Sequence, residues 1–388
     1  MNAITIIQSI MMSAVILFFV VLGNNFSVYS LIYASFLLFC FIRITSLEQK
    51  KKGSGMKYRR ICQSLYAVLF SISFINELIA ERGSMAITNE AFSNAELPFC
   101  HITIPQVLTP FLITKNLVFP ARITGHYAAV AGMLCLWFMF TVVLGRGWCS
   151  WVCFYGGLEQ GFSSIAKKPR INLLSKNREI REFQFGFFAF IVLGSLGAMA
   201  AIYCQWFCPF KLVTEYQPLD SIVGVIGGLI FAGLFVALVV VLPILTKRRT
   251  QCSMLCPFGA FASLTDRFSA FRVKIDTDKC KGCMKCAKSC PFGAIDLDTI
   301  RNKKGRPELT CAKCGECMGV CSENAISYDF RFTKKCGRPE PSTKIGKAVQ
   351  AFLDPALLFR FSAFSFFAVM SGSFSVKSME LIVNLIAR

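Results

Sequence analysis

Long apolar stretches, separated by short polar segments, are the feature that most constrains the fold of this chain. A helix that crosses the hydrocarbon part of a bilayer needs about 20 largely apolar residues. The chain is 54% hydrophobic and contains 39 phenylalanines, which is unlike an ordinary soluble domain. We therefore predict a polytopic α-helical membrane protein with six spans, near residues 4–22, 26–42, 61–80, 128–144, 184–203 and 221–245.

The charge pattern indicates how these spans are oriented. The net charge is +20, but the basic residues gather between the apolar stretches, so the pattern favours membrane orientation over nucleic-acid binding. Segment 43–60 holds seven basic residues and one acidic residue, whereas loops 81–127 and 204–220 hold four basic residues between them. Cytoplasmic loops carry the excess of Lys and Arg. We expect a multi-pass protein of the cytoplasmic (inner) membrane, in contact with lipid and with no nucleic-acid partner.

The C-terminal tail gives a weaker signal. Its apolar runs within 348–388 are interrupted by Pro, Arg or Ser-Gly, which is typical of amphipathic helices on the membrane surface. A seventh span, which would move the C-terminus to the outer side, is the alternative. The predicted domains are a transmembrane domain at 1–250, a ferredoxin-like α+β domain at 251–335 and membrane-associated C-terminal helices at 336–388.

Eight cysteines follow the spacing C-x2-C-x2-C-x3-C twice. Three cysteines on one tight loop can bind three irons of a 4Fe-4S cluster, while the fourth reaches the other cluster. Zinc also binds paired cysteines, but zinc does not need this third and fourth cysteine. The predicted ligand sets are Cys280, Cys283, Cys286 and Cys321 for the first cluster, and Cys311, Cys314, Cys317 and Cys290 for the second.

This cysteine-rich part, about residues 272–330, resembles the bacterial two-cluster ferredoxins. It includes "CPFGAID" and the corresponding "CSENAIS", in which Ser322 replaces the usual proline. The resemblance implies two 4Fe-4S clusters that relay single electrons and perform no catalysis, so no catalytic residue is predicted. Thiols that bind clusters in this way fit a reducing compartment, so we expect this domain on the cytoplasmic side.

Three further C-x3-C pairs lie where predicted helices leave the membrane. In each pair the two sulfurs are one helical turn apart and point to one side. The predicted topology puts two of the pairs on the cytoplasmic side, where Cys149, Cys153, Cys252 and Cys256 would form an inner boundary cluster.

The third pair, Cys204 and Cys208, follows the fifth span and should lie on the outer side. The preceding outer loop supplies Cys100 and His101, so an outer metal site of Cys204, Cys208, Cys100 and His101 is one interpretation. A Cys204–Cys208 disulfide and an inert pair are the alternatives.

The histidine supply restricts how electrons could cross. His101 and His126 are the two histidines, and neither lies in the middle of a span, so stacked bis-histidine haems are excluded. The apolar layer is about 30 Å thick, which is long for one electron step between boundary sites. Either the cysteine pairs lie deeper than the helix ends suggest, or a quinone or a partner's cofactor bridges the gap. Glu77, Glu159 and Glu215 are the acidic residues that could exchange protons with a quinone.

Residues 125–330 as a whole resemble the polyferredoxin-type NapH/NosR/MauN proteins. The likeness is carried by "GR-x-x-C-x-W-x-C" at 145–153, by "CPFGAF" at 256–261 and by the two-cluster ferredoxin. Phe154 stands where the motif of the family has proline. The resemblance implies electron transfer, as in a quinol dehydrogenase component, between cytoplasmic or quinone donors and an outer acceptor such as a cytochrome or iron–sulfur protein, with partner subunits. A metal or small-substrate reductase and a redox-sensing or assembly accessory protein are the alternatives.

Overall fold

The computed structural model describes residues 3–81, 101–114, 135, 137–211, 222–301, 305–332 and 352–387. The described part is mostly helical and contains one two-stranded sheet. It divides into two compact units, each described by itself below. The first unit comprises Met1–Leu69, Phe140–Gly157 and Thr265–Arg388, and the second comprises Phe70–Met139 and Leu158–Leu264.

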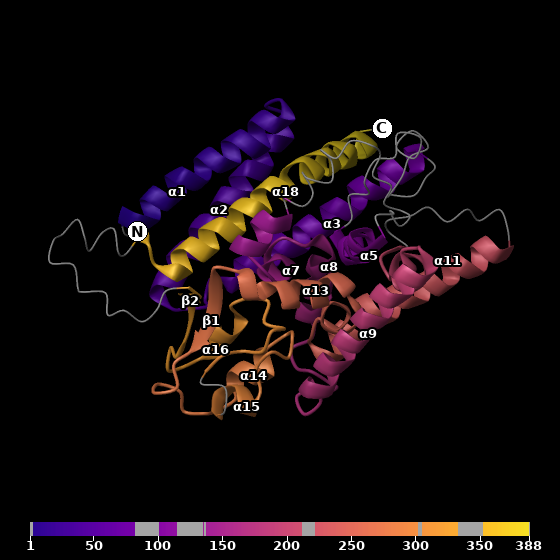
Figure 1. Cartoon of the computed structure of the whole chain (residues 1–388). Helices are drawn as coiled ribbons and strands as arrows, with labels where there is room; N and C mark the ends of the chain where they lie inside the picture. Colours follow the sequence, from indigo (N-terminus) through magenta and orange to yellow (C-terminus); the bar gives the residue numbers. More distant parts are fainter. Residues whose placement is uncertain are drawn as a thin grey trace. The chain divides into compact units, whose positions relative to one another are not determined.

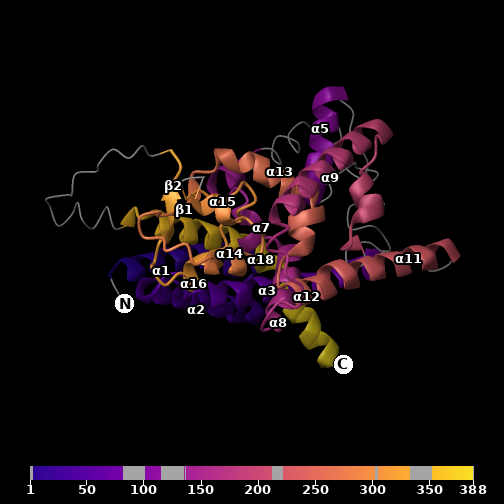
Figure 2. The same cartoon turned by 90° about the horizontal axis from the view of Figure 1, so that it is seen from below.

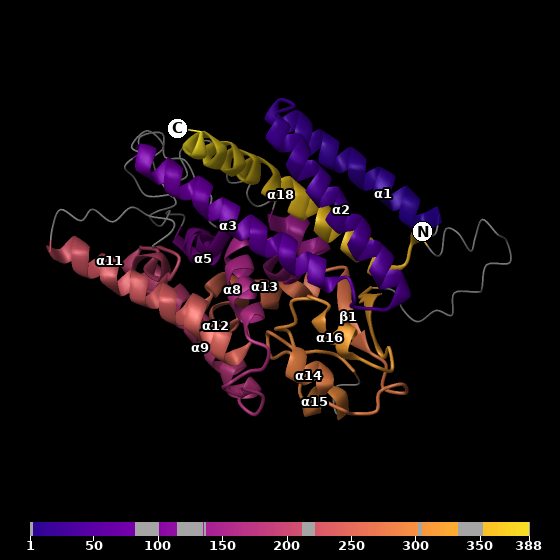
Figure 3. The same ribbon diagram turned by 180° about the vertical axis from the view of Figure 1, so that it is seen from behind.

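The apolar part of the first unit is a layer of long helices (Figures 1 and 3). Helix α1 (Ala3–Ile16) continues through the short turns η1 (Leu17–Val21) and η2 (Leu22–Asn24) into a tight connection. Helix α2 (Val28–Lys50) returns beside it, and α18 (Pro355–Ile386) packs against both. Helix α3 (Met56–Glu81) begins in this unit, and α7 (Gly147–Trp151) is a single short turn.

The ferredoxin-like part of the first unit starts at η7 (Asp266–Phe268) and is built around strands β1 (Phe271–Ile275) and β2 (Ile326–Phe330). The strands pair antiparallel, with Phe271 opposite Phe330 and Ile275 opposite Ile326. Helices α14 (Lys285–Ser289), α15 (Leu297–Arg301) and α16 (Glu316–Val320) lie between them in sequence. The fully buried Phe359 of α18 contacts the rings of Phe271 and Tyr328, which joins the sheet to the helical layer.

The second unit combines long helices with short turns that carry cysteines. Helix α5 (Ile104–Thr114), preceded by η3 (His101–Thr103), packs along α9 (Asn177–Ala198) (Figure 2). The other elements are α8 (Phe154–Ile165), η4 (Tyr203–Phe207), α11 (Ile222–Phe235), η5 (Val236–Val241), α12 (Leu242–Thr246), η6 (Gln251–Leu255) and α13 (Pro257–Thr265).

Five helices of the described residues are long and apolar enough to cross a membrane: Ile4–Asn24, Val28–Lys50, Asn177–Ala198, Gly224–Thr246 and Pro355–Ile386. Four of them overlap predicted spans. The predicted span at 61–80 is helical, as part of α3, but is not among the five, and most of the predicted span at 128–144 lies outside the described residues.

The C-terminal tail differs from the prediction of separate amphipathic helices, because residues 355–386 form one continuous helix. Pro355 does not break it, since it occupies the first turn, where proline is tolerated, and Asp354 caps that turn. Arg360 is buried but forms an ion pair with Glu48 of α2 at 3.1 Å. Gly372 packs against Val20. The residues that looked like interruptions are therefore packing positions.

Candidate metal centres

The first cavity of the ferredoxin-like part is lined by thiols from both halves of its sequence. The four thiols belong to Cys280, Cys283, Cys286 and Cys321. Cys283 is exposed, and Cys280 and Cys321 are half-buried. This site therefore opens to solvent.

The second cavity is lined by Cys290, Cys311, Cys314 and Cys317. Three of these thiols are buried, and the sulfur of Cys290 accepts a hydrogen bond from the amide of Ala294 at 3.3 Å. The two cavities group the cysteines in the sets that the spacing predicts. Four thiols around each cavity fit a 4Fe-4S cluster, although the ligation itself stays a prediction.

The local backbone explains why each fourth cysteine turns away from its own loop. Met284 (φ 59°) and Gly315 (φ 80°) are left-handed residues that start α14 and α16. Cys290 and Cys321 end these helices in extended conformations. Because β1 and β2 pair antiparallel, the two halves face each other, and each extended cysteine reaches the cavity of the other half.

Burial raises the pKa of the Cys311 thiol to about 12 and the pKa values of Cys286 and Cys314 to about 11. These thiols are therefore protonated at neutral pH when no metal is bound. Metal ligands must be deprotonated, so cluster binding at these cavities releases protons.

The turn that carries Cys149 is bonded directly to the ligand loop of the second cavity. Ser150 donates a hydrogen bond from its Oγ to the carbonyl of Ala312 at 2.5 Å, and Trp151 donates from Nε1 to the carbonyl of Lys313 at 3.2 Å. Ala312 and Lys313 lie between two of the predicted cluster ligands. Within the first unit, the C-x3-C turn and the second cavity are thus held in fixed register.

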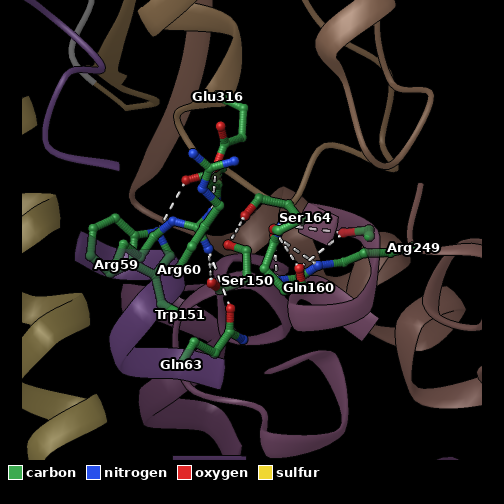
Figure 4. A network of polar contacts seen from close by, with 12 residues as sticks. Arg59, Arg60, Gln63, Ser150, Trp151, Gln160, Ser164, Arg249 and Glu316 are labelled. Atoms are coloured by element: carbon green, nitrogen blue, oxygen red, sulfur yellow. Dashed lines mark hydrogen bonds and ion pairs between the residues drawn. The ribbon is translucent and has the colours of Figure 1, made fainter. Parts of the chain in front are cut away.

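Arg59 strengthens this junction from α3 (Figure 4). Its buried guanidinium forms an ion pair with Glu316 of α16 at 2.8 Å and also donates to the carbonyl of Ser150. It lies 5.8 Å from the ring centroid of Trp151. One buried cation therefore connects three elements around the second cavity.

Gln63 holds the cysteine pair itself. Its Nε2 donates to the carbonyl of Cys149 at 3.2 Å and to that of Cys153 at 3.0 Å. Neither Arg59 nor Gln63 was predicted from the sequence as a functional residue. Their spacing of four residues puts them on one face of a helix that continues as an apolar stretch. This spacing is the signal that could have identified them.

All three C-x3-C pairs follow a left-handed residue. Gly145 (φ 53°), Met199 (φ 49°) and Lys247 (φ 56°) precede the first cysteine of their pairs by four or five residues. In two pairs the sulfur of the second cysteine accepts the amide three residues later at 3.4 Å, from Gly156 and from Gly259. The three segments thus share a left-handed residue ahead of the cysteine pair, and two of them also share this sulfur contact.

At Met199 the chain reverses, and η4 runs back beside α9. The ring centroid of Phe187 lies 6.3 Å from that of Tyr203 and 5.5 Å from that of Phe207. Phe187 precedes the end of α9 at Ala198 by eleven residues, which is about 16 Å along the helix. The turn that carries Cys204 therefore lies alongside α9, and the predicted outer side of this pair stays a prediction.

The chain also reverses after Lys247. Thr250 donates from Oγ1 to the carbonyl of Leu238 at 3.3 Å, so the segment returns along the apolar helix that it has just left. Gln184 of α9 donates to the carbonyl of Cys252 at 3.2 Å. Both cysteine turns of the second unit therefore fold back along the helix that precedes them, and we call them re-entrant in this sense. Their deeper placement in a membrane stays a prediction.

The two re-entrant turns meet at Tyr203. The side-chain amide of Gln251 donates to the Tyr203 hydroxyl, which joins the residues directly before the first cysteines of the two pairs. Four neighbouring cysteines lie near enough to the buried Tyr203 side chain to interact with it electrostatically. These cysteines are Cys208, Cys256, Cys204 and Cys252.

The structure gives mixed outcomes for the predicted boundary sites. Cys149 and Cys153 lie in the first unit and Cys252 and Cys256 in the second, so their joint inner cluster stays a prediction. His101 packs edge to face on Phe258 at 4.8 Å, and the described cysteines form no disulfide. Cys100, His126 and Glu215 lie outside the described residues, as does the side chain of Glu77. Within the described ranges no three His, Cys, Asp or Glu side chains lie together as the ligands of one single metal ion.

Glu159 of α8 caps the second re-entrant turn. Its fully buried carboxylate accepts the amides of Gln251 at 2.7 Å and Cys252 at 3.1 Å. Burial raises the pKa of Glu159 to about 7, although these hydrogen bonds and Arg249 oppose the rise. The carboxylate thus fixes the backbone of the turn, and its proton exchange with a quinone stays a prediction.

Replacing Glu159 by alanine should destabilise this turn. Each buried amide left without an acceptor costs about 1–3 kcal/mol, so we expect a clear fall in the thermal unfolding midpoint of the detergent-solubilised protein. Glu182→Ala is the matched control, because that exposed carboxylate makes only a surface pair with Arg178, worth about 0.3–0.5 kcal/mol. Equal midpoints for the two variants would contradict the capping role.

The comparisons with known proteins agree with this arrangement. One family model, described as a 4Fe-4S binding domain, matches residues 272–295. A second model with the same description matches residues 126–172, 184–217 and 229–276, and each of these three segments contains one C-x3-C pair. No solved structure matches the chain.

Several curated proteins are similar to the chain over part of its length. A protein of Escherichia coli K12 named for electron transport, YccM, is 26% identical over 42% of this chain and 46% of its own length. The methylamine utilization ferredoxin-type protein MauN of Paracoccus denitrificans is 29% identical over 40% of this chain and 51% of its own length. MauN of Methylobacillus flagellatus is 26% identical over 58% of this chain and 71% of its own length. The chain thus spans about half the length of the first two relatives.

The cavities, the repeated cysteine turns and these matches define an electron-transfer protein that carries 4Fe-4S clusters and has helices able to span a membrane. These matches support the resemblance to the polyferredoxin-type iron–sulfur proteins that the sequence motifs indicate. Proteins of this kind exchange electrons with redox partner proteins.

Proposed function

We propose that the chain is an electron-transfer subunit of the cytoplasmic membrane, within a multi-subunit redox complex. It would pass electrons between a cytoplasmic or quinone donor and an acceptor on the outer side, such as a cytochrome or an iron–sulfur protein. The observation that carries this proposal is the junction in the first unit, where Ser150 and Trp151 bond to the ligand loop of the second cavity. A ferredoxin serving only soluble partners would have no need to fix that loop to a cysteine turn in the membrane part.

The two cavities differ in how exposed their thiols are, and this difference suits electron transfer from the protein surface towards its interior. A 4Fe-4S cluster, when bound, supplies a centre that takes up and gives back one electron at a time. Three of the four thiols of the first cavity are at least partly exposed, whereas three of the four thiols of the second are buried. The second cavity also lies beside the α7 junction. The first cavity would thus exchange electrons with a soluble partner and the second with the membrane part.

The surface around the first cavity carries a group of lysines that could help a partner to dock. Four exposed lysines surround Cys283 in sequence: Lys279, Lys281, Lys285 and Lys288. Two of them form surface ion pairs, Lys279 with Asp276 at 3.6 Å and Lys281 with Glu323 at 3.0 Å. A positive face accelerates encounter with an acidic partner and aligns it. A cytoplasmic donor with an acidic face therefore fits this end of the chain.

Reconstitution into liposomes tests the proposal. Anaerobically purified protein is inserted into phospholipid vesicles that contain trapped cytochrome c, and dithionite is added outside. We expect the trapped haem to be reduced faster than in vesicles without protein. The variant Cys311→Ser/Cys314→Ser should fall to the rate of protein-free vesicles. Normal iron content without transmembrane reduction would contradict the proposal and favour the sensing or accessory function.

A further inference from the structure

We propose that Cys204, Cys208, Cys252 and Cys256 together hold a 4Fe-4S cluster between the two re-entrant turns of the second unit. This ligand set differs from the sequence-based pairing, which joined Cys252 and Cys256 to Cys149 and Cys153. The role of the site rests on the proposed electron-transfer function, whereas its ligand set rests on geometry alone.

The first argument is that the two turns have the same local structure. Each is a five-residue turn with π-type hydrogen bonding, Tyr203–Phe207 in η4 and Gln251–Leu255 in η6. Each ends in a cysteine of extended conformation, with φ −76° at both Cys208 and Cys256, followed by Pro-Phe. Single π-type turns occur often at functional sites. Two copies of one thiolate-presenting turn are what a four-thiolate site requires.

The second argument is that the turns are held against each other. The hydrogen bond from Gln251 to the Tyr203 hydroxyl joins the positions next to Cys252 and Cys204. Along α9, Gln184 contacts the second turn and Phe187 contacts the first. These two residues are three positions apart, or about 4.5 Å along the helix, so the pairs lie at nearly the same level.

The third argument is the polar environment of the sulfurs. Gln106 of α5 donates from Nε2 to the sulfur of Cys204 at 3.7 Å, while its Oε1 accepts the Tyr203 amide at 2.9 Å. Gly259 donates its amide to the sulfur of Cys256. Hydrogen bonds to the sulfurs stabilise thiolates and set the reduction potential of iron–sulfur clusters. A buried glutamine that orders one turn and also bonds its sulfur suits a cluster site better than a pair of inert thiols.

The position of the site has a functional consequence. Helix α9 is one of the helices able to cross a membrane, and both turns lie beside its middle part. An electron crossing an apolar layer of about 30 Å in one step between its two surfaces is slow. A redox centre beside the middle of α9 divides that distance into two shorter steps, without a quinone.

Iron and acid-labile sulfide counts on the full chain, purified anaerobically in detergent, test the ligand set. We expect Cys204→Ser/Cys208→Ser and Cys252→Ser/Cys256→Ser each to lose about four irons per chain. The quadruple variant should lose the same number, because all four substitutions remove one cluster. Cys149→Ser/Cys153→Ser should retain those irons.

Three outcomes would overturn the proposal. They are full iron content in Cys204→Ser/Cys208→Ser, additive losses in the quadruple variant, and loss of the same irons by Cys252→Ser/Cys256→Ser and Cys149→Ser/Cys153→Ser. Gln106→Leu provides a second test of the site if the cysteine variants do not fold. It should keep all the iron but lower the midpoint potential of one cluster, because a hydrogen bond to the Cys204 sulfur is lost. Unchanged potentials would count against the site. These readouts need no electron-transfer partner, so they separate this proposal from the function itself.

Discussion

Replacing Cys290 by serine should remove the cluster of the second cavity and leave that of the first. In sequence Cys290 directly follows three cysteines of the first set, but in the structure it lines the cavity of Cys311, Cys314 and Cys317. Because serine is a poor substitute for a thiolate ligand, we expect loss of about four irons per chain and of one electron paramagnetic resonance signal. Cys321→Ser should remove the other signal.

Double variants test directly whether Cys290 belongs to the cluster of the second cavity. Cys290→Ser combined with Cys311→Ser should lose no more iron than Cys290→Ser alone, whereas Cys290→Ser combined with Cys280→Ser should lose both clusters. Cys135→Ser is the matched control, since Cys135 is exposed and has no spaced partner. If Cys290→Ser and Cys280→Ser prove non-additive, the crossed ligand sets are wrong.

The ferredoxin-like cavities could be predicted from the sequence because their information is local. The spacing within 280–290 and 311–321 determines which cysteines share a loop, and the extended cysteine after each short helix follows from that spacing. The antiparallel pairing of β1 with β2 then brings the halves together. The structure groups the same cysteines around each cavity.

The re-entrant turns could not be predicted, because hydropathy does not report whether a chain continues outward or folds back. The reversals occur at Met199 and Lys247, which adopt left-handed conformations that are usually associated with glycine or asparagine. Nothing in their residue types signals a reversal. Gln106, which bonds to the reversed segment, is a polar residue in the apolar run "IPQVLTPF" and is the clue that the sequence did contain.

The tail shows the opposite error, in which polar residues were interpreted as interruptions of a helix. Arg360 is neutralised by Glu48, and Ser371, Ser375 and Ser378 are buried within the helical layer. Long-range partners decide whether a charge or a small residue ends a helix, and a single sequence does not contain them.

Asp266→Ala should be the most damaging substitution outside the cysteines. The buried Asp266 accepts the ammonium of Lys313 at 2.6 Å, the amide of Arg146 at 2.9 Å and the guanidinium of Arg331 at 3.0 Å. Lys313 lies in the ligand loop of the second cavity and is 2% exposed. Burial lowers the pKa of Lys313, and Asp266 opposes that change. Removing one partner of a buried ion pair costs about 3–5 kcal/mol.

The measurement is the thermal unfolding midpoint of anaerobically purified protein in detergent, followed together with iron release. Asp266→Ala should lower the midpoint strongly and speed iron loss from the second cavity, because Lys313 anchors its ligand loop to the carbonyl of Leu144 and to Ser269. Asp329→Ala, which breaks the partly exposed pair with Arg272, should cost only about 0–1 kcal/mol.

A double variant separates the effect of the paired charges from the effect of the volume that the two side chains fill. Replacing both partners of a buried pair by apolar residues of similar volume is often nearly neutral, so Asp266→Leu/Lys313→Met should recover stability relative to Asp266→Ala. It should not restore slow iron release, since the bond from Lys313 to Leu144 that orders the ligand loop is also lost. An Asp266→Ala midpoint equal to that of Asp329→Ala would show that this network does not hold the second cavity in place.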